Sequence, residues 1–415
     1  MRILLTTANQ SIVGGIEKYV QQIIPALLDR EHEIALLYEH RSADGSETVD
    51  PPGARLPIWY WQDVSPSSPV WRQLIDWNPD VVYSQGLGSL GVENVLLDRY
   101  PTIWYAHVYN GTCITGRKCH AFPKLTACTR EFGPACLALY YPRRCGGLNP
   151  LRAAHMYRMQ AERNHRLADY KQILVASRHM YAEYERHGVS PEKLGLLPLP
   201  VPDLVPEPNQ PTSRQPNGSI LFVGRLTDLK GVDYLIRAVP IAAKNLGRPL
   251  TLKIGGDGPG RESLARLAGQ SGVKVEFTGW LNVEQKKHAL QNADLLAVPS
   301  LWPEPFGLIG IEAGCYGLPA VGYAVGGITD WLIAGETGEI APGNSPTVEG
   351  LADAITRALG DPTHYARLCR KAWELSRQFT LEKHVTKLDA ILYSVCQSDP
   401  IHLGASLPSQ ERTTA

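Results

Sequence analysis

The chain has 415 residues, of which 44% are hydrophobic and 20% are charged. One hydrophobic core rarely serves a chain of this length, so two domains of roughly 200 residues each are expected. The 41 basic and 41 acidic residues balance, which argues against a nucleic-acid binder with a strong overall positive field. The opening stretch MRILLTTANQ has neither the length of a membrane span nor the pattern of a signal peptide, so we expect a cytoplasmic protein.

The first 110 residues alternate between short apolar runs and polar or helical stretches. A strand is predicted over residues 3–7, and Gly14-Gly15 then leads into a helix with apolar residues at helical spacing. Further strands are predicted over 33–38, 81–85 and 102–107. This alternation predicts a doubly wound parallel sheet, whose ligands bind at the carboxyl ends of the strands. Gly14, Gly15 and His107 all follow such ends.

Five of the eight cysteines lie between residues 113 and 145. No CxxC pair is present, and an odd number of cysteines argues against a closed set of disulfides. Three alternatives stay open: a loop insertion with free thiols, a structural metal or iron–sulfur site, and a disulfide-stapled loop. The candidate metal ligands are Cys113, Cys119, Cys128, Cys136 and Cys145.

A basic helical stretch follows over residues 150–171. Such a face is usually solvated surface, although it can also receive an anionic acceptor or a membrane headgroup. Beyond it, the polar and proline-rich residues 203–218 are typical of a linker.

The second half repeats the strand-then-turn pattern from residue 219 onward. Its first strand leads into Gly224-Arg225 and, five residues later, Lys230-Gly231. An Arg and a Lys around one strand-to-helix turn can converge on a diphosphate, the Arg by its fork of donors and the Lys as a point charge. Later strands lead into Gly255-Gly256, Gly279-Trp280-Leu281 and Pro299-Ser300.

The stretch over residues 299–313 is the strongest candidate site. Prolines at 299, 303 and 305 exclude a helix there, whereas residues 307–313 can form one, so free N–H groups are expected near residues 306–308. Those donors and the helix dipole favour a phosphate. Glu304 is expected ahead of the phosphate and Glu312 about two turns into the helix. A nucleotide diphosphate sugar has the length to be held at both ends.

The Glu304 to Glu312 pattern, with Phe-Gly-Leu between, resembles the signature of retaining glycosyltransferases of family 4, which have the GT-B fold. The Gly-Arg, Lys-Gly and Gly-Gly turns match the same family. The resemblance implies two Rossmann-like α/β domains facing a central cleft. It implies an N-terminal acceptor domain over 1–203 with a Cys-rich insert at about 113–145, a linker over 204–218, and a donor domain over 219–361. Closing helices over 362–397 and a mobile tail over 398–415 complete the expected organisation.

The resemblance also implies roles for individual residues. The leaving diphosphate removes the acceptor proton itself in this family, so no metal cofactor is required and the protein's contribution is electrostatic. The residues expected to carry catalysis are Arg225, Lys230, Glu304 and His107. Those expected to bind the donor are Gly14, Gly15, Gly224, Gly255, Gly256, Gly279, Trp280, Leu281, Pro305, Phe306, Gly307, Leu308 and Glu312.

The expected reaction moves a sugar from a UDP- or GDP-linked donor to a hydroxyl of a sugar, a lipid-linked molecule or a metabolite. Peripheral contact with the inner membrane surface is an open alternative, and no nucleic-acid partner is expected. The rival functions are a nucleotide-sugar epimerase or phosphorylase of the same fold, and a donor-binding protein without catalysis.

Overall fold

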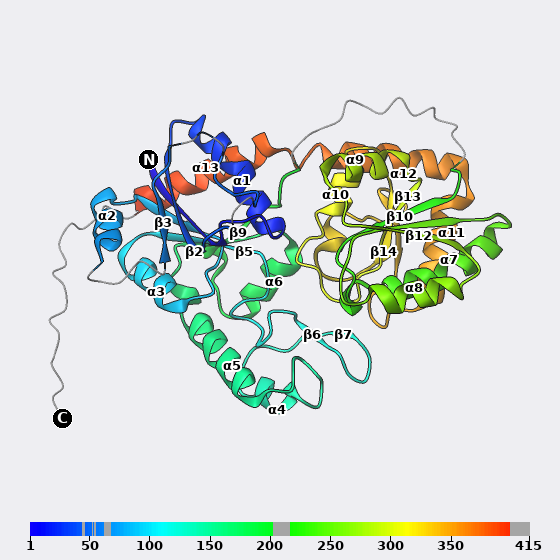
Figure 1. Cartoon of the computed structure of the whole chain (residues 1–415), viewed down its shortest axis with the longest axis horizontal. Coiled ribbons are helices and arrows are strands. Elements are labelled where there is room, and N and C mark those ends of the chain that lie inside the picture. The colour runs from blue at the N-terminus through cyan, green and yellow to red at the C-terminus, as the bar shows by residue number, and fades with distance from the viewer. Residues whose placement is uncertain (44–45, 52, 54, 62–67, 202–215, 399–415) are drawn as a thin grey trace.

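The computed structural model describes residues 1–43, 46–51, 53, 55–61, 68–201 and 216–398. Each half of the chain forms a parallel sheet with helices around it (Figure 1). The predicted α/β fold with two Rossmann-like domains is therefore confirmed. The predicted tail over 398–415 lies outside the described residues, except for Ser398. The predicted linker over 204–218 also lies outside them, except for its last three residues.

The N-terminal sheet has the strand order β3-β2-β1-β4-β5-β8-β9, and all of its pairings are parallel. Its strands are β1 (Arg2–Asn9), β2 (Glu33–His40), β3 (Ile58–Tyr60), β4 (Val81–Ser84), β5 (Thr102–Ala106), β8 (Gln172–Val175) and β9 (Leu194–Leu196). The main helices are α1 (Gly15–Leu28), α2 (Pro69–Trp77), α3 (Leu90–Arg99), α5 (Pro150–His165) and α6 (Arg178–Arg186). Short 3-10 turns are η2 (Leu167–Asp169) and η3 (Pro191–Lys193).

Alternate residues of β1 pack against different helices. Ile3 and Leu5 share a core with α1, whereas Leu4 belongs to the core formed with α2 and α3. Successive side chains of a strand point to opposite faces, so a strand covered on both sides is apolar throughout. The continuous apolar run at the N-terminus thus reflects a central strand.

The segment between β5 and α5 contains the predicted Cys-rich insert. It forms a small antiparallel pair and one short helix, which lie to one side of the N-terminal sheet (Figure 1). These elements are β6 (Cys119–His120), β7 (Thr126–Ala127) and α4 (Ala135–Tyr140).

The C-terminal sheet has the order β12-β11-β10-β13-β14-β15, again with parallel pairings. Its strands are β10 (Ser219–Val223), β11 (Thr251–Gly255), β12 (Lys274–Gly279), β13 (Leu295–Val298), β14 (Ala320–Tyr323) and β15 (Gly338–Ala341). Its helices are α7 (Val232–Leu246), α8 (Arg261–Gly269), α9 (Val283–Asn292), α10 (Ile309–Gly314) and α11 (Val348–Gly360), with 3-10 turns η4 (Asp228–Lys230) and η5 (Gly326–Asp330).

The closing segment consists of two helices, α12 (Pro362–Ser376) and α13 (Leu381–Ser398). Helix α12 stays with the C-terminal domain, where it packs on α10. Only α13 crosses to the N-terminal domain, where it packs on α1. The chain between α12 and α13 is bonded to the N-terminal half by a backbone hydrogen bond, from the Val201 N–H to the Phe379 carbonyl at 2.8 Å.

Candidate functional site

The turn after β10 is held against the turn after β13 by backbone contacts. Gly231 has φ +61°, and a Cβ there would lie 2.1 Å from the Pro299 carbonyl oxygen. Beside it, the Leu301 N–H donates to the Leu229 carbonyl at 2.9 Å. Only glycine allows this approach together with that φ. The Lys-Gly pair therefore brings Lys230 to the 299–313 stretch.

Lys230 and Glu304 form an ion pair, with 2.5 Å between Nζ and Oε1. The Ser300 hydroxyl donates to the same carboxylate oxygen at 2.6 Å. Glu304 is 6% exposed, so its charge is largely withdrawn from water and depends on these two donors. An ammonium has three N–H donors, so Lys230 keeps capacity for a second anionic partner.

A second glycine pair holds the backbone of Glu304. The Gly327 N–H donates to the Glu304 carbonyl at 2.6 Å. Gly326 has φ +56°, and a Cβ there would lie 2.3 Å from that carbonyl oxygen. A Cβ on Gly327 would meet the Pro305 carbonyl at 2.4 Å. Gly326 and Gly327 therefore fix Glu304 and Pro305 in place, a role that the sequence alone did not reveal.

The helix carrying Glu312 begins later than predicted. Helix α10 starts at Ile309 with Leu308 as its N-cap, so Glu312 lies in its first turn and not two turns in. The reason is Gly307, whose φ of +82° is left-handed, so that the helix cannot begin before this residue. Among the described residues, no acceptor is found for the N–H groups of Gly307 and Leu308.

Glu312 is held by Lys286 of α9, a residue that sequence reasoning missed. The Lys286 Nζ is 3.0 Å from Oε1 and 2.8 Å from Oε2 of the carboxylate. Lys286 lies on a polar helix with no adjacent motif, so the sequence carries no signal for this contact. Its role follows from the packing of α9 beside α10.

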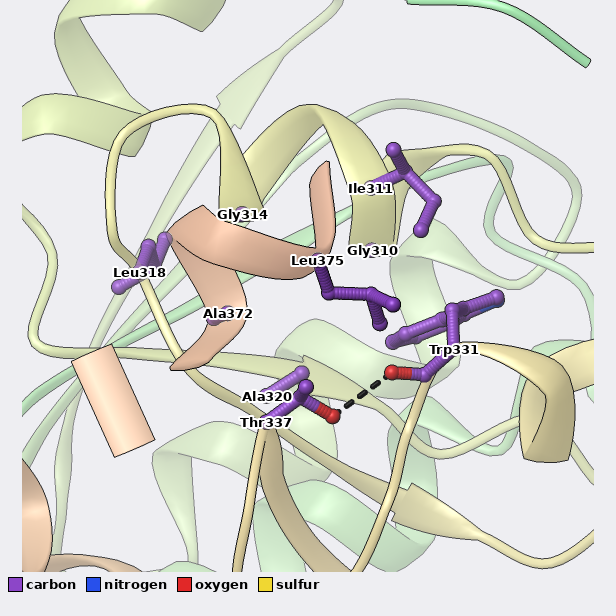
Figure 2. Close-up of a pocket in the computed structure, with 9 residues that line it drawn as sticks. All are labelled: Gly310, Ile311, Gly314, Leu318, Ala320, Trp331, Thr337, Ala372 and Leu375. Atoms are coloured by element: carbon purple, nitrogen blue, oxygen red, sulfur yellow. Dashed lines mark hydrogen bonds between the residues drawn. The ribbon is translucent and has the colours of Figure 1, made fainter. Parts of the chain in front are cut away.

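Trp331 supports the Phe306 end of the stretch. Its indole N–H donates to the Phe306 carbonyl at 2.6 Å, and its ring covers Gly310, where a Cβ would lie 2.1 Å from a ring carbon. Figure 2 shows a small cavity beside this ring, between α10 and α12, where the Thr337 hydroxyl donates to the Trp331 carbonyl. The cavity, about 10 Å³, has room for about one water molecule, so it is not a nucleotide site.

The glycines after β10, β11 and β12 allow three turns to touch. The Gly256 N–H donates to the Gly279 carbonyl at 2.7 Å, and a Cβ on Gly256 would lie 1.9 Å from the Gly224 carbonyl. A Cβ on Gly255 would meet Leu281 at 2.6 Å. These glycines are thus explained by packing inside the chain. Trp280, which directly follows β12, is 67% exposed.

No contact within the described part of the chain accounts for Arg225, Gly14 or Gly15. The Arg225 side chain is exposed, and its guanidinium has no partner within the described part of the chain. Gly14 has an extended φ of −167°, which any residue can adopt. A Cβ on Gly15 would meet nothing within 4 Å, and Val13 beside the pair is 71% exposed.

His107 is held as a neutral hydrogen-bonding group at the end of β5. Its Nε2–H donates to Gln85 Oε1 at 2.8 Å, which leaves Nδ1 as an acceptor. Its ring stacks on Tyr105 with 4.6 Å between centroids. Burial, with a smaller effect of nearby His384, lowers the pKa of His107 from 6.5 to about 3. His107 is therefore uncharged near neutral pH.

The two domains meet directly beside these residues. The Tyr109 hydroxyl, two residues after His107, donates to the Pro303 carbonyl at 2.7 Å. On α6, the Arg178 N–H donates to the Asp330 carboxylate at 2.8 Å. The turn after β5 and the stretch around Glu304, predicted as parts of one site, are thus brought together.

The five cysteines of the insert are free thiols. Cys145 Sγ lies 3.6 Å from His120 Nδ1, yet the described residues include no group of three or more His, Cys, Asp or Glu side chains placed to hold a metal ion. Burial raises the pKa of Cys119 to about 12 and that of Cys145 to about 11. The structure therefore shows free thiols, and within the described residues it supports neither the metal nor the cross-link alternative.

The insert is held instead by a buried lysine. The Lys118 ammonium pairs with Glu183 of α6, and both side chains are 2% exposed. It also donates to the Thr112 carbonyl at 3.1 Å and to the Arg130 carbonyl at 2.5 Å. These contacts satisfy the charge in a dry site and fasten the insert to the N-terminal domain.

Two family models match the chain. "Glycosyltransferase Family 4" matches residues 13–203, and "Glycosyl transferases group 1" matches residues 207–374. The chain belongs to glycosyltransferase family 4. Within this family 4 member, the first model covers most of the N-terminal domain and the second most of the C-terminal domain.

Curated relatives match over part of their length. The chain is 30% identical to an alpha-D-kanosaminyltransferase of Streptomyces kanamyceticus over 52% of this chain and 50% of that protein. It is 36% identical to a D-inositol 3-phosphate glycosyltransferase of Mycolicibacterium smegmatis over 43% of this chain and 41% of that protein. The matched segments thus span about half or less of these relatives.

Solved structures match this family 4 member over nearly its whole length. Anabaena HepE in complex with UDP and glucose aligns with a TM-score of 0.65 at 17% identity, over 95% of this chain and all of that one. A sucrose-phosphate synthase from Thermosynechococcus elongatus aligns with a TM-score of 0.65 at 19% identity, over 96% of this chain and all of that one. At these identities the likeness shows the GT-B fold alone.

No helix of the described residues is long and apolar enough to cross a membrane.

Proposed function

We propose that the protein is a retaining glycosyltransferase that moves a sugar from a UDP- or GDP-linked donor to an acceptor hydroxyl. The observation that carries the proposal is the Lys230–Glu304 ion pair, which lies in the same stretch as the free N–H groups before α10 and as Glu312 in its first turn. Arg225 lies in the turn after β10, the strand beside β13, and is proposed to add a second cation. These groups supply two cations and backbone donors for a diphosphate, with a carboxylate at either end for hydroxyl groups. Anabaena HepE, which has the same fold, was solved in complex with UDP and glucose, and this supports a donor of that kind.

In the proposed reaction, Arg225 and Lys230 stabilise the negative charge that grows on the leaving diphosphate. The bond from the anomeric carbon to the diphosphate breaks, the acceptor oxygen bonds to the same face of that carbon, and a phosphate oxygen takes the acceptor proton. Glu304 would contact the donor sugar, Glu312 the ribose, and neutral His107 the sugar hydroxyls. The side-chain-free turn at Gly14-Gly15 would let the backbone approach the donor.

The acceptor domain is proposed to be the N-terminal one, over 1–203, and the donor domain to be 219–361. The Cys-rich insert follows His107 directly, so it would influence the choice of acceptor. The acceptor is a sugar, a lipid-linked molecule or a metabolite.

Arg225→Ala tests the proposal most directly. Its side chain is exposed and unpaired within the described chain, so folding stability should be unchanged, whereas transfer should fall by roughly two to three orders of magnitude. Lys244→Ala, an exposed lysine near the C-terminal end of α7, is the matched control and should retain transfer.

The measurement combines a thermal-shift panel of UDP, GDP and their sugars with a transfer assay on the best-bound donor, since ligands of the native state raise its melting temperature. Donor conversion without any acceptor would favour the epimerase instead. Binding without turnover by the unmodified protein would favour the inactive donor-binding protein. Unchanged transfer in Arg225→Ala would contradict the residue roles proposed here.

A further inference from the structure

Positive charge is concentrated in one segment of this neutral chain. Residues 113–161 contain eight Arg or Lys and one acidic residue, Glu131, whereas the whole chain has 41 of each sign. Lys118 of this set is buried and paired. Those of the others that lie at the surface include Arg143, Arg144 and Arg152. The segment therefore presents a local positive field that the overall composition conceals.

The same segment exposes large apolar side chains. Leu148 is 85% exposed and Leu151 is 80% exposed, the highest values among the large hydrophobic residues of the described surface. They flank Asn149, which caps the N-terminus of α5 through its side chain. Scattered exposed leucines are ordinary, but five such residues lie within 30 positions here: Phe122, Leu137, Tyr141, Leu148 and Leu151.

These residues belong to one compact projection. The Arg144 guanidinium lies over the Phe122 ring, 5.1 Å from its centroid, and the Arg143 carbonyl accepts from the Phe122 N–H at 3.2 Å. A buried cluster of Ile114, Tyr140 and Ala153 ties α4 and α5 together underneath. Figure 1 shows α4 and the start of α5 at the outer end of this projection. We call the exposed residues Phe122, Leu137, Tyr141, Arg143, Arg144, Leu148, Leu151 and Arg152 the outer face.

We propose that the outer face docks on the surface of an anionic lipid bilayer. Arginines complement lipid phosphates, while leucines and aromatic rings can enter the headgroup and acyl boundary next to them. Nucleic acid and soluble polyanions satisfy the arginines but offer no apolar layer for Leu148 and Leu151. The combination of charge and aliphatic exposure therefore favours a bilayer.

The outer face is connected to the N-terminal domain close to the candidate site. The segment that carries it begins just after Tyr109, whose hydroxyl contacts Pro303, and Lys118 fastens it to α6. Docking would hold the turn that contains His107 on the bilayer side of the protein. The proposal itself requires no glycosyl transfer and is tested without any sugar.

The test is flotation of the full-length protein with vesicles of pure phosphatidylcholine and with vesicles containing about 40% phosphatidylglycerol. We expect binding to the anionic vesicles, weakened by high salt as for other charge-driven contacts. Arg143→Ser/Arg144→Ser should weaken partitioning by about 30-fold, since each basic residue near the surface contributes roughly five-fold. Leu148→Ser/Leu151→Ser should weaken it by about ten-fold or more.

The matched control is Arg266→Ser/Lys244→Ser, which removes two exposed cations of the C-terminal domain and should bind like the unmodified protein. Circular dichroism melting checks that all variants fold. Absence of binding to anionic vesicles would overturn the proposal. Full binding by the leucine variant, together with competition by soluble polyphosphate, would show a soluble polyanion site and overturn it as well.

Discussion

Replacing Lys230 with Met tests the ion pair at the centre of the proposed site. The substitution leaves Glu304, 6% exposed, with the Ser300 hydroxyl as its remaining side-chain donor. Removing one partner of a buried pair costs about 3–5 kcal/mol. The Lys230 side chain is 28% exposed, so water already screens part of this interaction. We therefore expect a loss of about 1–3 kcal/mol in the free energy of unfolding.

The double variant Lys230→Met/Glu304→Gln separates structure from chemistry. It removes both charges, so at least half of the lost stability should return. Transfer should stay reduced by roughly two to three orders of magnitude in the single and double variants, because the proposed reaction needs both groups. Denaturant unfolding measures the first effect, with Lys244→Met as the control, and a transfer assay measures the second.

Two results would refute this reasoning. If the double variant regained transfer along with stability, the pair would serve the fold alone and the catalytic roles of both residues would be wrong. If Lys230→Met unfolded like the unmodified protein, the pair would contribute no stability, and the argument from the burial of Glu304 would fail.

Two further predictions concern packing and pH. Gly310→Ala should lower the free energy of unfolding by about 1–3 kcal/mol, because its Cβ would lie 2.1 Å from the Trp331 ring. Gly15→Ala is the control, since a Cβ there meets open space. Equal stabilities of the two variants would contradict the packing argument. Burial lowers the pKa of His384 to about 4. Between about pH 6.5 and 4 the unfolded chain therefore binds a proton at His384 that the folded chain does not. The free energy of unfolding should fall as the pH falls through this range, by on the order of 3 kcal/mol. His384→Gln should reduce this slope and leave the part due to His107, whose pKa is lowered as well. An unchanged slope would show that His384 does not contribute to it.

The sequence by itself determined the order of the elements and the position of the candidate site. The apolar run of β1 and the glycine turns at Gly14-Gly15 and Lys230-Gly231 are patterns that can be recognised along the chain, because a strand covered on both faces is apolar throughout and glycines mark tight turns. Parallel strands place their following turns at one sheet edge, which is why Lys230 and Glu304 could be expected together before any contact was known. The start of α10 was missed because the left-handed φ of Gly307 is not visible in its identity.

Only the tertiary structure decided which distant side chains support the site. Lys286 reaches Glu312, Trp331 anchors Phe306, and Lys118 fastens the Cys-rich insert. None of these three has a local signature, since a lysine or tryptophan looks the same in sequence whether it faces solvent or a partner far along the chain. The insert's cysteines indicated a cross-link or metal site as much as free thiols, and their state depends on where folding places the sulfur atoms. Such contacts are set by the packing of whole elements, which no single stretch of sequence encodes.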